Sequence, residues 1–246
     1  MSSFAIRALR LKYAVQTLGR AKKPRIFVNS IPKSGTNLIV SLAKAYGRLR
    51  VSGPFIAPHM QATHLARAGG LVFGHIEIVT GRITECGFED GILLMRRPEA
   101  YAASLGRYID VNPRHPLHAQ LAGATPAVLL ASVIEGIEAG LFHLPPLHER
   151  YAAYLDNATE AGLRVADYDR LLNAPATGTA EADLLAHLGG PDYAASFDTV
   201  LAMSRKISST WRHSARATRD FSLPDPLAAH PNLREATALY EAALRR

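Results

Sequence analysis

Hydrophobic positions along the chain alternate between short β-type runs and longer helical repeats. The run "RIFVNS" at 25–30 is typical of a central parallel strand. Apolar residues then recur at helical spacing over 38–46 and stop at Gly47, a residue that suits a helix C-cap. Two further strands are predicted at 70–76 and 91–97. The first hundred residues therefore indicate a strand–helix–strand pattern.

The rest of the chain continues this alternation. Pro98 opens a predicted helix whose apolar face carries Tyr101, Leu105 and Tyr108. Further elements are predicted as helices over 125–141, 145–161, 179–188 and 231–245, as a strand running into a short helix over 162–172, and as loops over 51–70 and 110–125. Strands that alternate with helices predict an α/β fold with a central parallel sheet and helices on both faces.

Charge divides the chain into two parts. The net charge is +7, yet residues 1–25 alone hold seven Lys and Arg and no acid, so the other basic and acidic residues cancel. We predict a basic amphipathic segment over 1–24 and a single domain over 25–246. Phe4, Ala8 and Leu11 share one face of a helix, which favours packing on the chain's own domain. Peripheral contact with an anionic membrane and dimerisation are the alternatives, and the oligomeric state is undefined.

Composition excludes several classes of protein. The apolar fraction of 48% is that of a folded globular protein, and no apolar stretch is long enough to predict a transmembrane helix. The single cysteine, Cys86, excludes an internal disulfide and fits a reducing, cytoplasmic compartment. Outside the N-terminal segment the charges balance and no basic–aromatic interleaving appears, which argues against nucleic-acid binding.

The polar loop "IPKSGTN" at 31–37 lies between a predicted buried strand and an apolar helix. Such a junction presents backbone N–H groups and the positive end of a helix dipole, which together bind anions. Gly35 lets the backbone approach the anion, and Lys33 adds a full positive charge. Ser34, Thr36 and Asn37 can cap the helix or donate hydrogen bonds. We interpret the loop as a phosphate cradle, against the alternative of an ordinary capped turn.

A second motif, "RRPEAYAAS" at 96–104, strengthens this interpretation. Arg96 follows a predicted strand and Ser104 lies on the next helix, so a guanidinium and a hydroxyl can grip one phosphate together. The loop at 31–37 is not a Walker A motif, because its lysine precedes its one glycine. We also expect no later strand to end in an aspartate that could hold Mg²⁺. Both points disfavour a kinase.

Four segments in this order resemble sulfotransferases that use 3′-phosphoadenylyl sulfate (PAPS). "PKSGTN" resembles their 5′-phosphosulfate loop, and "RRPEAYAAS" resembles their 3′-phosphate motif. "GHIEIV" at 74–79 is similar to a strand-end segment between those motifs, and "VADYDRLLNAP" at 165–175 is similar to a later one, with Asp169 as its acid. The resemblance spans about 24–175. It implies a three-layer sandwich like that of P-loop NTPases.

The resemblance also implies roles for individual residues. Lys33 would contact the sulfuryl group and its bridging oxygen. Ser34, Gly35, Thr36 and Asn37 would hold the 5′-phosphate. Arg96 and Ser104 would hold the 3′-phosphate of PAPS and of its product adenosine 3′,5′-bisphosphate (PAP). No metal is implied, since in-line transfer of a singly charged group needs placement and charge stabilisation above all.

The remaining candidates concern the acceptor and the adenine side. His75 would be the general base, for which a neutral imidazole with a pKa near working pH is suited. Glu77 is its rival, two residues further on the same face of a strand. His59 and His64 are candidates for the acceptor loop. The segment 208–221 lacks the family's glycines but keeps basic residues, among which Arg212 is the candidate 3′-phosphate contact.

These residues predict a cytoplasmic enzyme that moves a sulfuryl group from PAPS to a hydroxyl. The acceptor would be a small molecule or a glycan. The low aromatic content of 7% and the aromatic-poor loops favour a carbohydrate or a lipid-linked sugar over a planar phenol. Two alternatives stay open: a Mg²⁺-dependent small-molecule or nucleoside kinase, and a non-catalytic nucleotide-binding relative.

Overall fold

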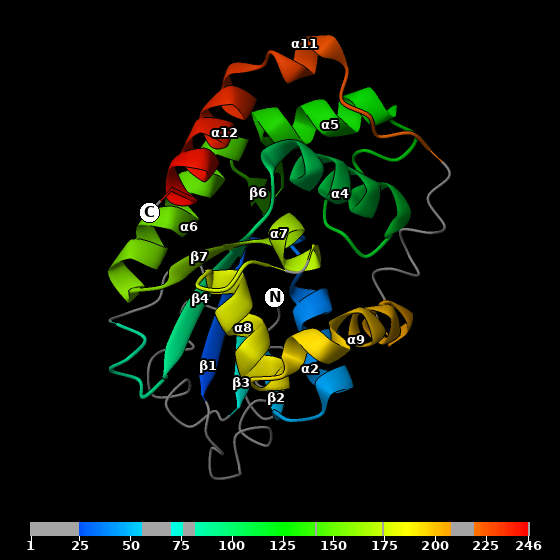
Figure 1. The fold of residues 1–246 in the computed structure, drawn as a ribbon. Coiled ribbons are helices and arrows are strands. Elements are labelled where there is room, and N and C mark those ends of the chain that lie inside the picture. Colours follow the sequence, from blue (N-terminus) through cyan, green and yellow to red (C-terminus); the bar gives the residue numbers. More distant parts are fainter. Residues whose placement is uncertain are drawn as a thin grey trace.

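A five-stranded parallel sheet forms the centre of the molecule (Figure 1). The computed structural model describes residues 25–55, 70–75, 82–140, 142–173, 175–207 and 219–245, so the predicted N-terminal segment lies outside the described residues. The strands are β1 (Ile26–Ser30), β2 (Val51–Phe55), β3 (Leu71–Gly74), β4 (Asp90–Met95) and β7 (Arg164–Asp167), in the spatial order β2-β3-β1-β4-β7. All five residues of β1 are buried, as expected for a central strand. The predicted α/β fold is confirmed.

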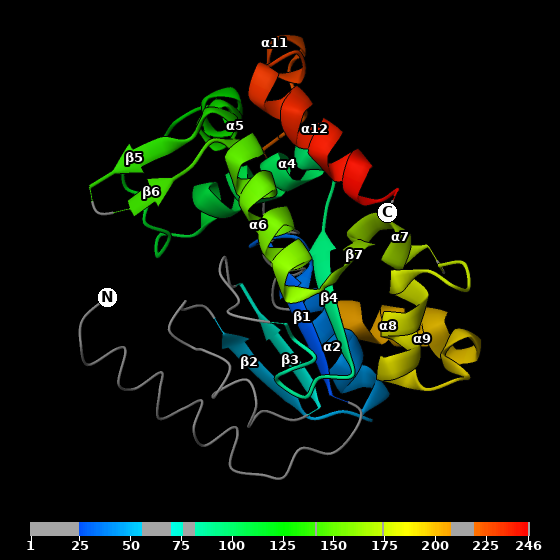
Figure 2. The ribbon, with the colours of Figure 1, turned by 90° about the vertical axis from the view of Figure 1, so that its left-hand side faces the viewer.

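Helices cover both faces of this sheet. They are α2 (Thr36–Tyr46), α4 (Pro98–Val111), α5 (Pro126–Glu135), α6 (Leu147–Ala161), α7 (Tyr168–Leu172), α8 (Ala180–Gly189), α9 (Tyr193–Ile207), α11 (Asp225–Ala228) and α12 (Pro231–Ala243). Helices α2, α8 and α9 pack on one face, and α4, α5, α6 and α12 lie on the other (Figure 2). Successive residues of β1 alternate between the two layers, with Phe27 in one apolar core and Ile26 and Val28 in the other.

Local signals set many element boundaries as predicted. Helix α2 ends at Gly47, which adopts a left-handed conformation with φ 68° and donates to Ala43 O. Pro98 is the first residue of α4. The predicted strand over the start of 162–172 is β7, and it runs directly into α7. The strands at β1, β3 and β4 and the helices α6, α8 and α12 also lie where the hydrophobic pattern places them.

Two local predictions are wrong. The helix predicted over 125–141 ends at Glu135, because Gly136 turns the backbone to φ 88°, and a hairpin of β5 (Ile137–Ala139) and β6 (Phe142–Leu144) follows. Residues 51–55, predicted as part of a loop, form the edge strand β2. Gly53 and Pro54 hide this strand in the sequence, since both residues weaken a strand signal and are tolerated at an edge.

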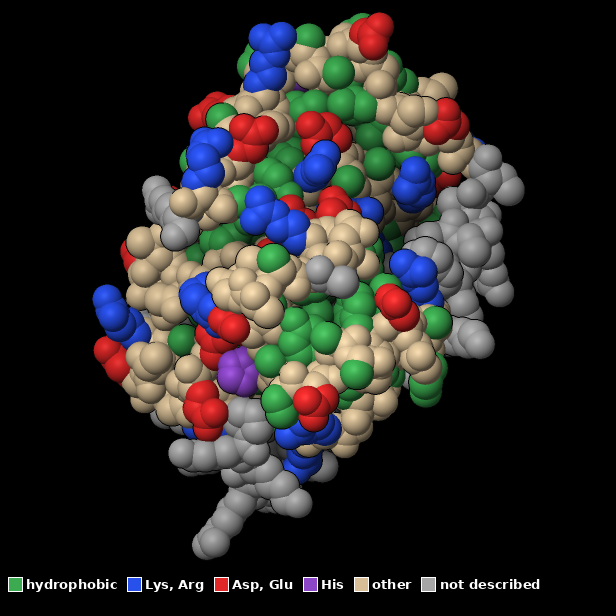
Figure 3. All heavy atoms as spheres, viewed as in Figure 1, with side chains coloured by type: hydrophobic (Ala, Val, Ile, Leu, Met, Phe, Trp, Pro, Cys, Tyr) green, Lys and Arg blue, Asp and Glu red, His purple; other side chains and the backbone are tan. Residues whose placement is uncertain are grey.

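The strand order reverses direction at the carboxyl end of β1. From β1 the chain runs to β2 and β3 on one side and then to β4 and β7 on the other, so the connections diverge at this point. In open α/β sheets this divergence is where ligands bind. Lys and Arg side chains are interspersed with Asp and Glu over the face viewed in Figure 1 (Figure 3).

Candidate functional site

The register of the parallel strands brings the predicted site residues together. Asn29 of β1 is paired with Gly74 of β3, so the next residues, Ser30 and His75, are neighbours. In the same way Met95 of β4 is paired with Asp167 of β7, so the residues that follow them, Arg96 and Tyr168, are also neighbours. The Arg96 guanidinium carbon lies 4.8 Å from the centre of the Tyr168 ring. Residues far apart in the sequence therefore converge at one edge of the sheet.

The loop after β1 is a tight turn into α2. Ser34 N donates to Ile31 O at 3.0 Å, and Lys33 has φ 77°. Lys33 is the one residue other than glycine with a positive φ in the described part of the chain, a conformation that persists only where surrounding structure imposes it. Gly35 is the N-cap of α2 and offers no side-chain cap. The positive end of the helix dipole therefore lies within the loop.

The hydroxyl groups of the loop do not cap α2, contrary to one of the predicted options. The Thr36 hydroxyl instead forms a hydrogen bond with the Ser30 hydroxyl at the end of β1. Asn37 is exposed on the first turn of the helix. Ser34 is fully buried, and its Oγ has no hydrogen-bond partner among the described residues.

Tyr168 makes the glycine at position 35 necessary. A Cβ added to Gly35 would lie 2.1 Å from Cδ2 of the Tyr168 ring, and the backbone there has φ 102°. The ring of Tyr168 thus contacts the loop with one part and the Arg96 guanidinium with another. Sequence reasoning recorded only the acid Asp169 in this segment and missed the tyrosine beside it. Its position directly after a predicted strand was the available signal.

Lys33 is the electrostatic centre of the site. Burial and, to a smaller extent, the nearby Arg96 guanidinium together lower the pKa of Lys33 to about 8. The ammonium nitrogen rests 3.8 Å from the centre of the Tyr108 ring, an arrangement in which the ring face stabilises a cation. No carboxylate of the described residues contributes to this shift, so the Lys33 ammonium lies in a partly desolvated space near a second cation.

Two buried polar groups without hydrogen-bond partners also favour a bound anion at this site. The Nε atom of Arg96 is buried and, like Ser34 Oγ, finds no hydrogen-bond partner among the described residues. A buried polar atom without a partner costs about 1–3 kcal/mol, and native structures rarely keep one without a reason. A phosphate or sulfate would supply acceptor oxygens to both donors and a negative charge beside the two cations. The residues present therefore fit an anionic nucleotide.

His75 is held in the tautomer that a general base requires. Its Nδ1 lies 2.9 Å from Ser30 O and 3.1 Å from Ser30 Oγ. Because a carbonyl oxygen only accepts, Nδ1 carries the proton and Nε2 of the neutral ring keeps its lone pair. Burial lowers the pKa of His75 below its usual 6.5, the hydrogen bond to Ser30 opposes this, and Lys33 lowers the pKa again. The imidazole is therefore neutral at pH 7.

An aromatic row leads away from Lys33. Tyr108 of α4 meets His115 edge-on at 5.6 Å between ring centres, and His115 meets Phe142 of β6 at 5.8 Å. Leu117 N donates to His115 Nδ1 at 3.2 Å, which leaves the other ring nitrogen as a donor. Burial lowers the pKa of His115, and Lys33 and His118 lower it further. Sequence reasoning missed this row because its members come from three separate elements.

The other predicted site residues are placed as follows. Ser104 is half-buried on α4, two turns after Arg96. His59, His64, Glu77 and Arg212 lie outside the described residues, so their roles stay predictions. Of the basic residues near Arg212, Arg205 of α9 acts on the pKa of Tyr168, which burial raises and Arg96 and Arg205 lower. Arg219 instead pairs with Asp110 at 2.6 Å.

The expectation that no later strand ends in an aspartate is wrong. Strand β7 ends at Asp167, whose side chain is buried. One carboxylate oxygen accepts from the backbone N–H groups of Asp169 and Arg170 at the start of α7, and the other accepts from the Tyr240 hydroxyl. Asp167 therefore acts as a helix cap inside a hydrogen-bonded network. Across the described ranges, no group of three or more His, Cys, Asp or Glu is arranged as metal ligands.

A cavity of about 770 Å³ lies between α7 and α12. Its lining includes Arg97, Asp169, Arg170 and Tyr240, and none of residues 31–37. It is therefore separate from the loop after β1. None of the helices in the described part of the chain is both long and apolar enough to span a membrane.

Comparisons with known proteins give one kind of match. No protein-family model matches the chain, and no curated protein matches it. Among solved structures, the chain is similar to the crystal structure of mouse sulfotransferase SULT7A1 complexed with PAP, with 17% sequence identity and a TM-score of 0.49. The match covers 91% of this chain and 78% of that chain. The interpretation of the site rests on the chain's own residues.

Proposed function

We propose that the protein is a sulfotransferase that moves a sulfuryl group from PAPS to a hydroxyl of an acceptor. The observation that carries the proposal is the meeting of Lys33, Arg96 and His75 at the carboxyl ends of three neighbouring strands. Two of these groups are cations, and no carboxylate of the described residues contributes to the pKa shift of Lys33; the third is a neutral imidazole with a free lone pair. An anionic donor and a hydroxyl acceptor are the substrates that suit this set.

The donor would be bound from two sides. The loop of Lys33, Ser34 and Gly35, with Thr36 and Asn37 on the first turn of α2, would hold the 5′-phosphate through backbone N–H groups and hydroxyls. Arg96 would hold the 3′-phosphate, with Ser104 two turns along α4 and Arg212 as further candidates. The buried Ser34 hydroxyl and the Arg96 Nε supply hydrogen-bond donors that are otherwise unsatisfied.

Lys33 would stabilise the charge of the departing phosphate. PAPS supplies the activated sulfuryl group, and the protein supplies placement and charge. With a pKa of about 8, Lys33 is largely protonated at pH 7 and can donate a hydrogen bond to the bridging oxygen. Its ammonium rests on the face of Tyr108 and is close enough to Arg96 for that charge to lower its pKa.

His75 would take the proton of the acceptor hydroxyl at Nε2. The hydrogen bond from Nδ1 to Ser30 O fixes the ring orientation and stabilises the imidazolium that forms. Glu77 stays the alternative base. The row of Tyr108, His115 and Phe142 would form one wall of the acceptor site. Such a wall accepts the apolar face of a sugar as well as a planar ring, so small molecules and glycans are both candidates.

A thermal-shift comparison of nucleotides tests the proposal. PAP should raise the melting temperature strongly, while ATP with Mg²⁺ should raise it weakly, because only PAP carries a phosphate for Arg96. Equal shifts, or a larger shift with ATP and Mg²⁺, would favour the kinase alternative. Transfer of labelled sulfate from PAPS to a panel of phenols, sugars and lipid-linked sugars then separates an enzyme from a non-catalytic relative.

A further inference from the structure

Two tyrosines from the outer helical layer reach the strand ends that carry the candidate site. Tyr151 of α6 is fully buried, and its hydroxyl donates to the backbone oxygen of Arg96 at 2.5 Å. Tyr240 of α12 is buried as well, and its hydroxyl donates to the carboxylate of Asp167. These contacts span 55 and 73 residues of sequence. Each hydroxyl meets the chain at or next to one member of the Arg96–Tyr168 pair.

The carboxylate that Tyr240 contacts controls the start of α7. Asp167 accepts from Asp169 N at 2.5 Å and from Arg170 N at 2.9 Å, and its own N–H donates to Glu181 at 2.5 Å. Glu181 is only 2% exposed. The direction in which Tyr168 leaves the sheet therefore depends on a buried polar network in which one Asp167 oxygen accepts two hydrogen bonds. Such networks are costly when one member is removed.

Side-chain packing is incomplete between α7 and α12. A cavity of about 770 Å³ lies there, lined by Asp169 and Arg170 of α7 and by Thr237 and Glu241 of α12. Helix α7 is only five residues long, and one of its residues, Leu171, is fully buried in the core. A short helix beside a cavity has space to shift, and the Tyr240 hydroxyl ties the N-cap of α7 to α12.

We propose that Tyr151 and Tyr240 are positioning residues that hold Arg96 and Tyr168 in the arrangement that selects a nucleotide with a 3′-phosphate. Tyr151 fixes the backbone from which the Arg96 side chain extends. Tyr240 fixes the ring on which the Arg96 guanidinium rests. Helices α6 and α12 pack against each other, so the outer layer acts on the site through both tyrosines. Neither tyrosine contacts the donor itself. The inference rests on the proposed function, in which Arg96 binds that phosphate.

Both hydroxyls remain donors over the whole working pH range. Burial raises the pKa of Tyr151 well above its usual value, as it does that of Tyr240, where the Asp167 carboxylate adds to the effect. The two tyrosines are therefore protonated, and both contacts are hydrogen bonds, at neutral pH. Removal of one oxygen by Tyr→Phe substitution deletes the contact and keeps the ring that packs in the core.

The test is the preference for PAP over AMP, measured by isothermal titration calorimetry as the dissociation constant of AMP divided by that of PAP. AMP lacks the 3′-phosphate, so the ratio reports the Arg96 contact and cancels a general loosening of the protein. We expect Tyr151→Phe and Tyr240→Phe each to lower this ratio by roughly tenfold, with AMP binding nearly unchanged. In a Tyr168→Leu background, Tyr240→Phe should lower the ratio no further, because its target is gone.

Tyr46→Phe is the matched control. Its hydroxyl donates to Tyr193 O at 3.4 Å at the far end of α2, so the ratio should stay at the wild-type value. Urea unfolding checks that each variant is folded, and either tyrosine variant alone suffices for the test.

Three results would overturn the inference. If both variants keep the wild-type preference, or lose PAP and AMP binding equally, the tyrosines do not position Arg96 while the proposed function stands. If the Tyr168→Leu background leaves the Tyr240→Phe effect intact, Tyr240 does not act through Tyr168. A wild-type protein that binds AMP as tightly as PAP would instead remove the proposed function, and this inference with it.

Discussion

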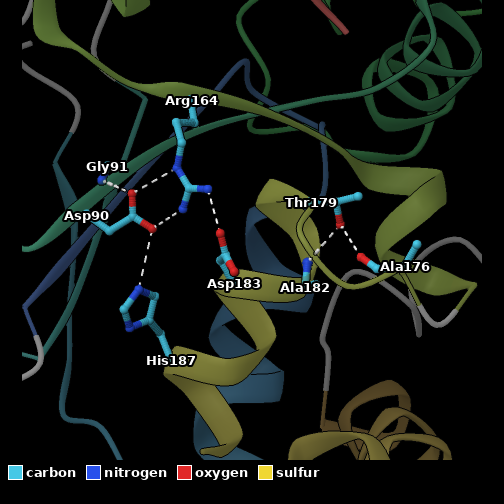
Figure 4. A network of polar contacts seen from close by, with 8 residues as sticks. All are labelled: Asp90, Gly91, Arg164, Ala176, Thr179, Ala182, Asp183 and His187. Carbon is cyan, nitrogen blue, oxygen red and sulfur yellow. Dashed lines mark hydrogen bonds and ion pairs between the residues drawn. The ribbon is translucent and has the colours of Figure 1, made fainter. Parts of the chain in front are cut away.

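The two ends of the central sheet differ in how their charged side chains are paired. At the amino ends of β4 and β7, Asp90 accepts from Arg164 Nη2 at 2.5 Å and from Gly91 N at 2.8 Å (Figure 4). Arg164 also donates to Asp183 of α8 at 2.6 Å, and His187 Nε2 lies 3.4 Å from Asp90. Each charge in this group, which we call the amino-end network, has a partner of opposite sign.

At the carboxyl ends the cations are crowded together. Burial and the Arg96 guanidinium lower the pKa of Lys33, and the buried Ser34 hydroxyl and Arg96 Nε lack partners among the described residues. A network with matched charges stabilises the folded chain and needs no ligand. A group of unmatched cations costs stability, and an anion relieves that cost. This difference in charge pairing identifies the carboxyl end of the sheet as the candidate site without reference to any sequence motif.

The largest contrast is expected from removing one cation at each end. Lys33→Met should lower the rate of sulfate transfer by roughly 10²–10³-fold, because the charge on the leaving oxygen loses its partner. Arg164→Met, the matched change in the amino-end network, should leave the rate within about twofold, since it lies far from the site. Labelled-sulfate assays with PAPS measure both. Equal losses would show that the two ends do not differ in function.

The pH dependence of kcat/KM for PAPS should sharpen the assignment of His75. The rate requires neutral His75, so it should rise about tenfold per pH unit below the lowered pKa of this group, which lies under 6.5. It also requires protonated Lys33, so it should fall again above the Lys33 pKa of about 8.

A substitution of the base separates the two candidates. His75→Ala should abolish turnover and keep PAP binding. If Glu77→Ala does this instead, the base is Glu77. An acid limb that survives in His75→Ala would point the same way.

Ser34→Ala should have opposite effects on stability and on binding. Loss of a buried hydroxyl without a partner should raise the free energy of unfolding of the nucleotide-free protein by about 1 kcal/mol, because the cost of desolvating that group disappears. The same change should weaken PAP binding by roughly tenfold, because the anion loses a donor. Urea unfolding and calorimetry give the two values. A variant that is less stable would mean that the hydroxyl is already satisfied.

Asp90→Asn should behave in the reverse manner. It should lower the free energy of unfolding at pH 7 by about 1–2 kcal/mol without changing PAP binding, because it leaves Arg164 without its main partner. Burial alone would raise the pKa of Asp90, but hydrogen bonds from His187 and Arg164 outweigh it and bring the pKa below 3.8. A group with a lowered pKa stabilises the fold above its unfolded value, and that stability is lost as the pH falls through the folded value.

Unfolding at several pH values tests this linkage. The difference between wild type and Asp90→Asn should be constant at neutral pH and should shrink below about pH 4. A constant difference down to the acid limit would mean that the carboxylate charge contributes nothing.

The parts of the site that depend on one continuous segment could be predicted from the sequence. The loop at 31–37 appears as a polar stretch between a strand and a helix, and Arg96 follows an apolar run, because strand ends and helix starts leave local signals. Tyr168 was missed since a single tyrosine after a strand is a common feature. Its contacts with Gly35 and Arg96 arise only when β7 pairs with β4. The edge strand β2 and the β5–β6 hairpin were missed because glycine and proline interrupt their patterns.

The sequence by itself determined the alternation of strands and helices, the parallel sheet, and the polar loop with its lysine, because periodicity and turn residues act over a few neighbouring positions. Only the tertiary structure decided which side chains meet at the strand ends, which polar atoms there stay unsatisfied, and how the tyrosines of α6 and α12 reach them. Burial, register and long-range hydrogen bonds depend on pairs of residues that are 50 or more positions apart, and a pattern read along one chain does not contain those pairs.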